Sequence, residues 1–304
     1  MRIPLREDLA LDGAAVLRLL AGPLEAWPGV RVRSCGPRLL KRTSKRLVVR
    51  YELGGGGGRE LGVVGKWYTT DDGALVSRSL SLLRECFADR DVSVPAVVAY
   101  LPEVRALFME AVNGDILRDT LRHDQSTATR AGAWLAAFHR SSISNAHECG
   151  PAKMGRAVER WTRETPALAG LTAELAAALA ALPDPALPVH FDYHHSQLLL
   201  VPGGPIVGLD LDEAGIGDPA FDVTHFEAHL TLLALQWFGD PDRFAPARDA
   251  FRSGYSAVAP LPEHQPALTA FAWLKLARQL LRNAAQPRER DYALAAVRRS
   301  LSAL

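Results

Sequence analysis

Residues 190–197, with the sequence HFDYHHSQ, bring three histidines, one aspartate and one glutamine together in eight positions. The carboxylate of Asp192 could orient a hydroxyl nucleophile and take its proton as a general base. The amide oxygen of Gln197 is a hard ligand of the kind that Mg²⁺ prefers, whereas the imidazoles of His194 and His195 would suit a borderline metal such as Zn²⁺. The segment is therefore open to three interpretations: a catalytic loop, a metal site, or a polar turn without chemistry.

A further acidic group follows at Asp210, and the residues in between predict where it lies. The stretch QLLLV, the turn PGGP and the stretch IVGLDLD indicate a short β-hairpin. A tight hairpin places the start of one strand beside the end of the other, so we expect Gln197 and Asp210 to lie close together. An amide and a carboxylate in this arrangement would suit Mg²⁺, with Asp192 on the loop just before them.

The elements that must position these residues fall into two parts of different character. Residues 1–112 contain an amphipathic helix near the start, several β-rich stretches, and a helix from about Asp72 to Phe87. Residues 113–304 are mostly helical, with the hairpin as the main exception. We therefore expect an α+β protein with a sheet-rich N-terminal lobe, residues 1–112, and a mostly helical C-terminal lobe, residues 113–304.

The motif HFDYHHSQLLL…IVGLDLDEAGIGDPAFD resembles the catalytic region of the aminoglycoside phosphotransferases and related small-molecule kinases. That family usually carries an HGDxxxxN loop, an (I/V)DFD-type segment and a GDPxxD segment. The resemblance implies a two-lobed, protein-kinase-like fold that transfers the γ-phosphate of ATP, with Mg²⁺, to a hydroxyl of a small molecule. It also implies that Asp192 is the catalytic base and that Gln197 and Asp210 bind Mg²⁺.

The motif departs from the family pattern at several positions. Phe191 stands where glycine is usual, Leu211 stands where phenylalanine is common, and Gln197 replaces asparagine. Glutamine keeps the amide oxygen but adds a methylene, roughly 1.5 Å of reach. The loop or strand would have to shift, or a water would have to bridge, to keep the octahedral geometry of Mg²⁺. Further along, we expect Asp218 to cap a helix and Asp222 to brace the catalytic loop.

The resemblance also assigns nucleotide-binding residues to the first lobe. Lys66 lies in the middle of the β-rich stretch GVVGKWY, where a lysine is unusual unless it is paired or used. It would contact the α- and β-phosphates of ATP, and Glu85 on the following helix would hold it. The alternative is an exposed lysine on an edge strand and a solvated helix glutamate. The glycines at 54–58 are expected to form a hairpin turn and not a phosphate loop.

The turn RTSKR, residues 42–46, is a candidate cover for the phosphates. Ser44 and the neighbouring backbone N–H groups could meet the β- and γ-phosphates, and Lys45 or Arg46 would add positive charge; a solvated basic turn is the alternative. The stretch LFMEAVNG would form the hinge, where adenine would hydrogen-bond to backbone groups around Glu110 and Val112. This hinge assignment follows from the resemblance in fold alone.

Other functions fit parts of the motif. A metallohydrolase would use His190, Asp192, His194, His195 and Asp210. No fourth ligand motif accompanies these residues, and we expect the adjacent side chains of His194 and His195 to diverge as exposed loop residues. A catalytically weakened, kinase-like nucleotide-binding protein is a second alternative, suggested by Gln197. A kinase that acts on peptide serine or threonine is a third.

The acceptor is not defined by the motif, because a fold does not determine a substrate. A sugar, an amino alcohol and an aminoglycoside-like antibiotic all fit a hydroxyl-directed phosphotransferase. A polycationic aminoglycoside would require several carboxylates facing the cleft. The candidate carboxylates are Glu213, Glu227, Asp240 and Asp242.

Composition sets limits on partners and compartment. The formal net charge of +1 argues against a bulk field that would attract nucleic acid or an anionic membrane. No run of about 18 apolar residues predicts a transmembrane helix. The three cysteines, Cys35, Cys86 and Cys149, are widely spaced, which favours a reducing cytoplasm. We expect a cytoplasmic protein with a small-molecule substrate, and the sequence leaves the oligomeric state open.

Overall fold

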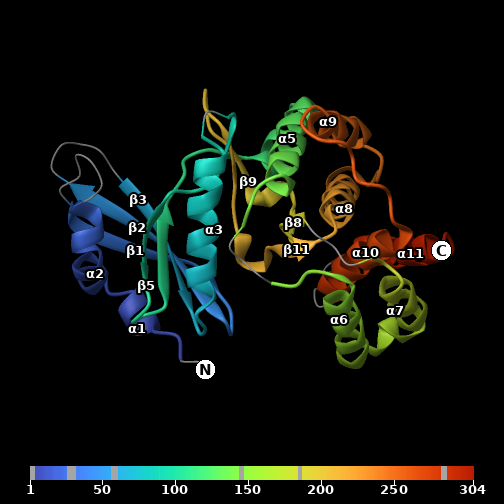
Figure 1. The fold of residues 1–304 in the computed structure, drawn as a ribbon, viewed down its shortest axis with the longest axis horizontal. Helices are drawn as coiled ribbons and strands as arrows, with labels where there is room; N and C mark the ends of the chain where they lie inside the picture. Colours follow the sequence, from blue (N-terminus) through green and yellow to red (C-terminus); the bar gives the residue numbers. More distant parts are fainter. Residues whose placement is uncertain are drawn as a thin grey trace. The chain divides into compact units, whose positions relative to one another are not determined.

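The computed structural model describes residues 4–25, 32–55, 61–88, 90–143, 147–183, 187–281 and 286–304. The chain divides into two compact units (Figure 1). The first contains Met1–Gly114, the short piece 142–145 and Val201–Asp212, and the second contains the rest. A sheet dominates the first unit and helices dominate the second, which confirms the predicted α+β class. Most of the glycine-rich turn predicted at 54–58 lies outside the described residues.

The sheet of the first unit has five strands in the order β1-β2-β3-β6-β5, and every neighbouring pair is antiparallel. The strands are β1 (Val32–Arg42), β2 (Arg46–Gly55), β3 (Leu61–Tyr68), β5 (Val97–Leu101) and β6 (Ala106–Glu110). Alternate residues such as Tyr51 and Trp67 are buried in one cluster with residues of α1 (Glu7–Ala10) and α2 (Gly13–Glu25). Because strand side chains alternate between faces, Lys66 points to the opposite face of the sheet.

The helix α3 (Asp72–Cys86) lies on the other side of the sheet from α2 (Figure 1). Its buried residues include Val76, Leu80 and Leu83, which recur at intervals of three and four and therefore share one face of the helix. The sequence predicted this helix from Asp72 to Phe87, and the structure confirms it to within a residue.

A small parallel strand pair connects residues 201–212 to the first unit. β4 (Val92–Ser93) pairs with β10 (Ile206–Gly208), which follows the predicted PGGP turn. The Val201 N–H donates to Pro205 O at 3.3 Å, and Gly203 adopts a left-handed φ of 64° that suits glycine. The residues directly after β10 therefore belong to the sheet unit, although they lie far along the chain.

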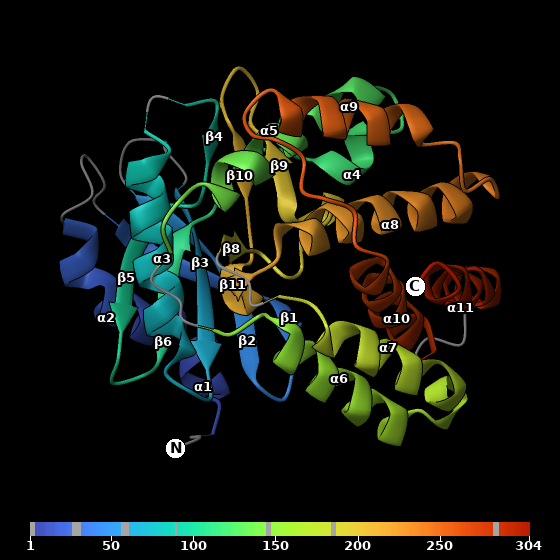
Figure 2. The ribbon, with the colours of Figure 1, turned by 45° about the vertical axis from the view of Figure 1, so that its right-hand side comes forward.

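The second unit is built from helices and two short antiparallel strand pairs, β7 with β9 and β8 with β11 (Figure 2). The strands are β7 (Asp115–Ile116), β8 (Leu187–Val189), β9 (Leu198–Leu200) and β11 (Gly215–Gly217). The α-helices are α4 (Leu117–Thr120), α5 (Ala128–His139), α6 (Pro151–Glu164), α7 (Thr172–Ala180), α8 (Pro219–Phe238), α9 (Ala245–Ser256), α10 (Pro266–Leu281) and α11 (Pro287–Leu301). The 3₁₀ turns are η1 (Gln125–Thr127), η2 (Pro166–Leu171), η3 (His195–Gln197) and η4 (Leu211–Glu213). No described helix is long and apolar enough to cross a membrane.

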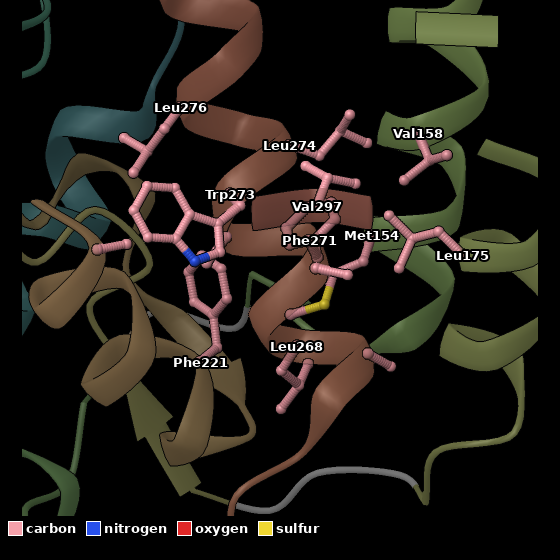
Figure 3. Packing of buried hydrophobic residues seen from close by; sticks show 14 of the residues in the cluster. Met154, Val158, Leu175, Phe221, Leu268, Phe271, Trp273, Leu274, Leu276 and Val297 are labelled. Atoms are coloured by element: carbon pink, nitrogen blue, oxygen red, sulfur yellow. The ribbon is translucent and has the colours of Figure 1, made fainter. Parts of the chain in front are cut away.

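The helix α10 lies at the centre of the second unit's core. Figure 3 shows Phe271 and Leu274 of α10 gathered with Met154 of α6, and the Phe271 ring lies 5.6 Å from the ring of Phe221 of α8. Residues 267–277 of α10 are buried with one exception, and Lys275 is the charged residue among them. A lysine in such a position requires partners that compensate its charge.

Close packing of α5 against α9 depends on two glycines. A Cβ atom on Gly132 would collide with the carbonyl oxygen of Phe251, and one on Gly254 would collide with that of Thr129. Glycine is therefore needed at both positions for the two backbones to approach. This contact places Tyr255 of α9 beside His139 of α5.

Candidate active site

Two carboxylates follow β10 and meet a buried lysine in the first unit. The ammonium of Lys66, in β3, donates to Asp210 Oδ1 at 2.7 Å and to Asp212 Oδ2 at 2.5 Å. The side chain of Lys66 is only 9% exposed. This lysine is therefore a paired residue and not the solvated edge-strand lysine of the alternative interpretation.

Arg46 and Tyr68 complete this cluster. The guanidinium of Arg46 pairs with both carboxylates and reaches Asp210 Oδ2 at 3.2 Å. Tyr68 donates its hydroxyl to Asp212 Oδ1 at 2.6 Å. Arg46 and Tyr68 are direct partners in the register of β2 and β3, so the strand pairing itself brings them together. Two cations and two carboxylates leave the cluster electrically balanced.

Burial and neighbouring charge act in opposite directions on this cluster. Burial alone would lower the pKa of Lys66, but the charges of Asp212 and Asp210 raise it above its usual value. Burial would raise the pKa of Asp210, yet Lys66 and Arg46 hold it well below its usual range. The pKa of Asp212 is raised, chiefly by burial and also by the charge of Asp210. Asp210 is therefore the carboxylate of the pair that is firmly ionised.

The backbone of Asp210 is also unusual, with a φ of 59°. Residues other than glycine rarely adopt this left-handed conformation, which costs on the order of 1–3 kcal/mol and persists where the surroundings enforce it. Here the ion pairs to Lys66 and Arg46 hold the side chain in place. A strained backbone under an ionised carboxylate is typical of a functional position.

The assignment of Glu85 as the residue that holds Lys66 is corrected by the structure. Glu85 is exposed near the end of α3, whereas the bonds that Lys66 makes within the described residues go to the two aspartates. An α-helix turns about 100° per residue, so Glu85 lies about 200° around the helix from the buried Leu83. The side chain therefore points away from the sheet on which Lys66 lies.

The basic turn between β1 and β2 is closed by Thr43. Its N–H donates to the carbonyl oxygen of Arg46 at 2.9 Å, and its Oγ1 accepts from the Lys45 and Arg46 N–H groups at 3.2 and 3.1 Å. Ser44 and Lys45 are exposed at the tip of this turn. The structure thus places both residues directly before Arg46 and the carboxylate cluster.

The predicted hinge residues lie at the end of β6. The N–H of Glu110 donates to Ala96 O at 2.8 Å, and its carboxylate accepts from the Ala96 N–H at 3.2 Å. The same carboxylate lies 3.8 Å from Arg84. Val112 follows two residues later, beyond the strand. The side chain of Glu110 therefore braces the β5–β6 edge, and only its carbonyl could serve the hinge role.

In the second unit, the loop aspartate Asp192 is held by a lysine that the sequence did not single out. The ammonium of Lys275 donates to Phe191 O at 2.6 Å, to Asp192 Oδ1 at 3.0 Å and to Glu213 Oε2 at 3.3 Å. An ammonium has three protons, so these acceptors satisfy all of its donors. The signal in the sequence was a lone charge in the apolar helical run FAWLKLA, because such a residue is seldom buried without partners.

Both members of the pair formed by Lys275 and Asp192 are charged. Burial alone would raise the pKa of Asp192, but the charge of Lys275 holds it well below its usual range. Burial would lower the pKa of Lys275, but Asp192 and Glu213 raise it. Asp192 is therefore ionised, and its direction is fixed by a charge-assisted hydrogen bond.

The backbone of the same loop is fixed by Asp222 of α8. Its carboxylate accepts from the N–H groups of His190 at 2.6 Å and Phe191 at 2.8 Å, and it lies 3.1 Å from His139 Nε2. The other ring nitrogen of His139 lies 2.8 Å from the Tyr255 hydroxyl. This geometry confirms that Asp222 braces the loop. The predicted cap at the start of α8 is also confirmed, since Asp218 accepts from the Ala220 N–H at 2.8 Å.

Phe191 adopts a left-handed φ of 65°, which explains why glycine is usual at this position. Several contacts compensate for the missing glycine. The Phe191 N–H and C=O are bonded to Asp222 and Lys275, and its ring packs on Phe221 with the centroids 4.8 Å apart. The departure from the family pattern therefore keeps the backbone geometry of the loop and adds a hydrophobic anchor.

The histidines of the loop are packed and not exposed, which corrects the expectation for His195. His190 is fully buried and His195 is 6% exposed. The ring of His194 stacks on His229 at 4.5 Å, and His229 meets His225 at 4.6 Å. Burial lowers the pKa of His195 and His229 well below the usual value, and lowers that of His225 to about 3. These three imidazoles are therefore neutral at pH 7.

The metallohydrolase interpretation finds no support in this arrangement. Among the described residues, no group of three or more His, Cys, Asp or Glu side chains could hold a metal ion. Gln197 ends η3, where its N–H donates to His194 O at 2.9 Å, and its side chain is half-buried. The histidine-rich segment is thus a braced loop whose imidazoles pack on one another.

These features define the fold class of the protein-kinase-like phosphotransferases: a sheet unit with a paired strand lysine, and a helical unit with a braced loop aspartate. A model of the phosphotransferase enzyme family matches residues 76–266, which is more than half of the chain. The chain therefore belongs to the phosphotransferase enzyme family. It is therefore a phosphotransferase. No curated protein matches the chain.

Solved structures of low sequence identity share this fold. The choline kinase LicA from Streptococcus pneumoniae matches with a TM-score of 0.62 and 14% identity, over 95% of this chain and 99% of that one. The macrolide 2'-phosphotransferase MphH from Brachybacterium faecium gives 0.56 and 16%, over 94% and 97%. The spectinomycin phosphotransferase APH(9)-Ia, in complex with ADP and spectinomycin, gives 0.59 and 11%, over 95% and 94%.

Proposed function

We propose that the protein transfers the γ-phosphate of ATP to a hydroxyl of a small molecule, with Mg²⁺, and that Asp192 directs the acceptor hydroxyl. The observation that carries the proposal is the double fixation of Asp192. Lys275 holds its carboxylate, and Asp222 holds the backbone immediately before it. A loop aspartate that is kept ionised and aimed by its surroundings suits a group that must orient a nucleophile.

The low pKa of Asp192 defines how it would act. A carboxylate with a strongly lowered pKa is a weak base towards an alcohol in the ground state. Phosphoryl transfer through a loose transition state depends mainly on positioning and electrostatic stabilisation. We infer that Asp192 aligns the hydroxyl for in-line attack and takes its proton as the phosphoryl group moves.

The cluster in the first unit supplies groups suited to a nucleotide and its metal. Asp210 offers an ionised hard oxygen, and Gln197, which belongs to the second unit, offers an amide oxygen; this donor chemistry fits Mg²⁺. Both residues would hold the ion, which would neutralise charge on the β- and γ-phosphates. Lys66 would contact the α- and β-phosphates. Arg46 is the further cation in this cluster and would add positive charge beside them.

The remaining nucleotide contacts follow the family resemblance. Ser44 and Lys45, at the tip of the basic turn, would cover the β- and γ-phosphates. The backbone around Glu110 and Val112 would bind adenine. Glu85 is removed from this set, because it is exposed on α3.

Gln197 favours one alternative, a nucleotide-binding protein with weak turnover. A panel of hydroxyl compounds, monitored for ADP release with and without Mg²⁺, separates the two functions. The proposal predicts acceptor-dependent ADP release that requires Mg²⁺ and is lost in Lys66→Ala. Nucleotide binding without turnover on any acceptor would favour the alternative. A Gln197→Asn variant that gains at least about tenfold in kcat would show that the longer side chain limits the metal site.

A further inference from the structure

A cavity of about 310 Å³ lies within the second unit, beside the loop that carries Asp192. It is bordered by α4, η3, α8, α10 and the start of α11, and by Gln286 just before α11. His195 and Ser196 of the loop form one wall. Leu276, the residue after Lys275, forms part of another. The loop and α10 therefore contribute to the cavity wall and also carry Asp192 and its partner Lys275.

The cavity wall is connected to Asp192 through packed imidazoles. His229 lines the cavity and stacks on His194. It also meets His225, whose ring Nδ1 lies 3.1 Å from the carbonyl oxygen of Tyr193, the residue after Asp192. The Nε2 atom of His229 is buried and has no hydrogen-bond partner among the described residues. A buried nitrogen in this state calls for a water or a ligand group to satisfy it.

The charge of the cavity excludes a site built for a polycation. Among its described lining residues, the formal charges are those of Arg118 and Glu289, which cancel. Arg118 is itself paired with Asp119 at 2.9 Å. His229 is neutral, because burial lowers its pKa well below the usual value.

The carboxylates that could have bound an aminoglycoside are engaged elsewhere. Glu213 pairs with Lys275, Glu227 with Arg252, and Asp242 with Arg248. Asp240 is exposed, and its Oδ1 accepts a hydrogen bond from the Asp242 N–H at 3.0 Å. None of these four acidic residues lines the cavity. The described lining also contains no Phe, Tyr or Trp, so it offers no aromatic cage for a quaternary ammonium group.

What the cavity offers instead is a set of neutral groups that both donate and accept hydrogen bonds. Gln236, Gln279 and Gln286 contribute amides, Ser196 a hydroxyl, and the two histidines an imidazole each. Hydroxyl groups have the same dual character. Leucines of α8 and α10 provide apolar surface between these groups. Its volume lies at the lower end of the range for ligand pockets, which suits one sugar-sized ring.

We propose that this cavity binds an uncharged polyhydroxyl compound of about one sugar ring. The inference stands independently of the proposed phosphotransferase function, because Asp192 is not among the residues that line the cavity. The compound would be held by hydrogen bonds to imidazole and amide groups of the lining.

Binding to the full-length protein without nucleotide tests the site directly. Calorimetry or saturation-transfer NMR would compare neutral hexoses, pentoses and cyclitols with an aminoglycoside and with choline. We expect at least one neutral compound to bind and the cations to bind at least about tenfold more weakly. His229→Phe keeps an aromatic ring at this position but removes the ring nitrogens. It should weaken the binding of the neutral compound about tenfold. His123→Phe, at an exposed histidine outside the cavity, should not.

A change of charge at the cavity provides a second test. Gln279→Glu places a carboxylate on the cavity rim and should raise the affinity for the aminoglycoside, whereas Gln265→Glu, outside the lining, should not. The proposal is overturned if no neutral compound binds, or if a cation binds more tightly to the unaltered protein. Phosphorylation of any compound tests the proposed function and not this site, so the two proposals can fail separately.

Discussion

Asp192 depends on one neighbour for both its charge and its direction. Lys275 reaches the loop from α10 and donates to its carboxylate and to the carbonyl oxygen of Phe191. A carboxylate that is buried without such a partner tends to take up a proton. At the scale of single residues, the candidate site is therefore a pair, and the lysine is a positioning residue for the aspartate.

Lys275→Met should raise the pKa of Asp192, because Lys275 is the largest of the charges that oppose the effect of burial. Asp192 works as the ionised form, so the acidic limb of the pH profile of kcat should move to higher pH, with a loss of activity as pH falls. Kinetic measurements between pH 5 and 9 test this. Lys153→Met is the matched control, since Lys153 lies over the Phe191 ring and makes no bond to Asp192. An unshifted acidic limb in Lys275→Met would contradict the role.

A second residue-scale prediction concerns the left-handed backbone of Phe191. Phe191→Ala loses the buried ring and should lower the free energy of unfolding by about 3–5 kcal/mol. Phe191→Gly loses the same ring but relieves the left-handed strain, so it should be the more stable of the two by about 1 kcal/mol. Urea unfolding of both variants measures the difference. The usual order, with alanine more stable than glycine, would show that the backbone is not strained.

At the scale of elements, α8 organises the loop that carries Asp192. The helix starts at the Asp218 cap, and within its first turn it presents Asp222 to two backbone N–H groups of the loop. α5 and α9 support this arrangement through His139 and Tyr255. The loop is therefore held by regular structure as well as by its own side chains.

Asp222→Asn should disturb this arrangement, because an amide presents one acceptor and one donor group to three hydrogen-bond donors. We expect a loss of about 1–3 kcal/mol in the free energy of unfolding and a lower kcat with nearly unchanged nucleotide affinity. Asp218→Asn is the matched control, because asparagine caps helices about as well as aspartate. Equal effects of the two substitutions on kcat would argue against the bracing role.

At the scale of the whole molecule, functional groups are divided between the two units. Lys66 and Asp210 belong to the first, while Asp192 and Lys275 belong to the second. Buried neutral imidazoles are confined to the second unit, at His195, His225 and His229. Their titration therefore reports on the stability of that unit.

The pKa of each of these imidazoles is lower in the folded chain than in the unfolded chain. Below about pH 6.5 the unfolded state binds more protons, so the free energy of unfolding should fall as pH falls, by up to about 1.4 kcal/mol per unit for each histidine. Lowered aspartate pKa values act only below about pH 4. Urea unfolding between pH 7.5 and 5.5 isolates the histidines. His225→Gln should reduce the slope, and a flat profile in the unaltered protein would contradict neutral burial.

The sequence predicted the class of fold from local signals, and the family motif predicted that Asp222 braces the loop that carries Asp192. Strand alternation, helix periodicity and the Asp218 cap are short-range signals. The family resemblance pointed to Asp192, Gln197 and Asp210, whose roles stay predictions. Lys66 was correctly singled out as a strand lysine that must be paired.

The partners of these residues were beyond prediction, because they come from distant parts of the chain. Lys66 is bonded to carboxylates 144 and 146 residues further on, and Asp192 is bonded to a lysine 83 residues further on. Glu85 was chosen from the family pattern, but it lies on the solvent-facing side of α3. The return of residues 201–212 to the sheet unit likewise follows from a strand pairing of only a few residues.

The most direct test of the account is Asp192→Asn, assayed with Mg²⁺, ATP and the best acceptor from the hydroxyl panel. Asparagine keeps the shape of the side chain and its bond to Lys275 but removes the charge that aligns the hydroxyl. The account predicts a fall in kcat of at least about 100-fold, with ATP binding nearly unchanged. Turnover at the level of the unaltered protein would contradict the assignment of Asp192 and, with it, the proposed mechanism.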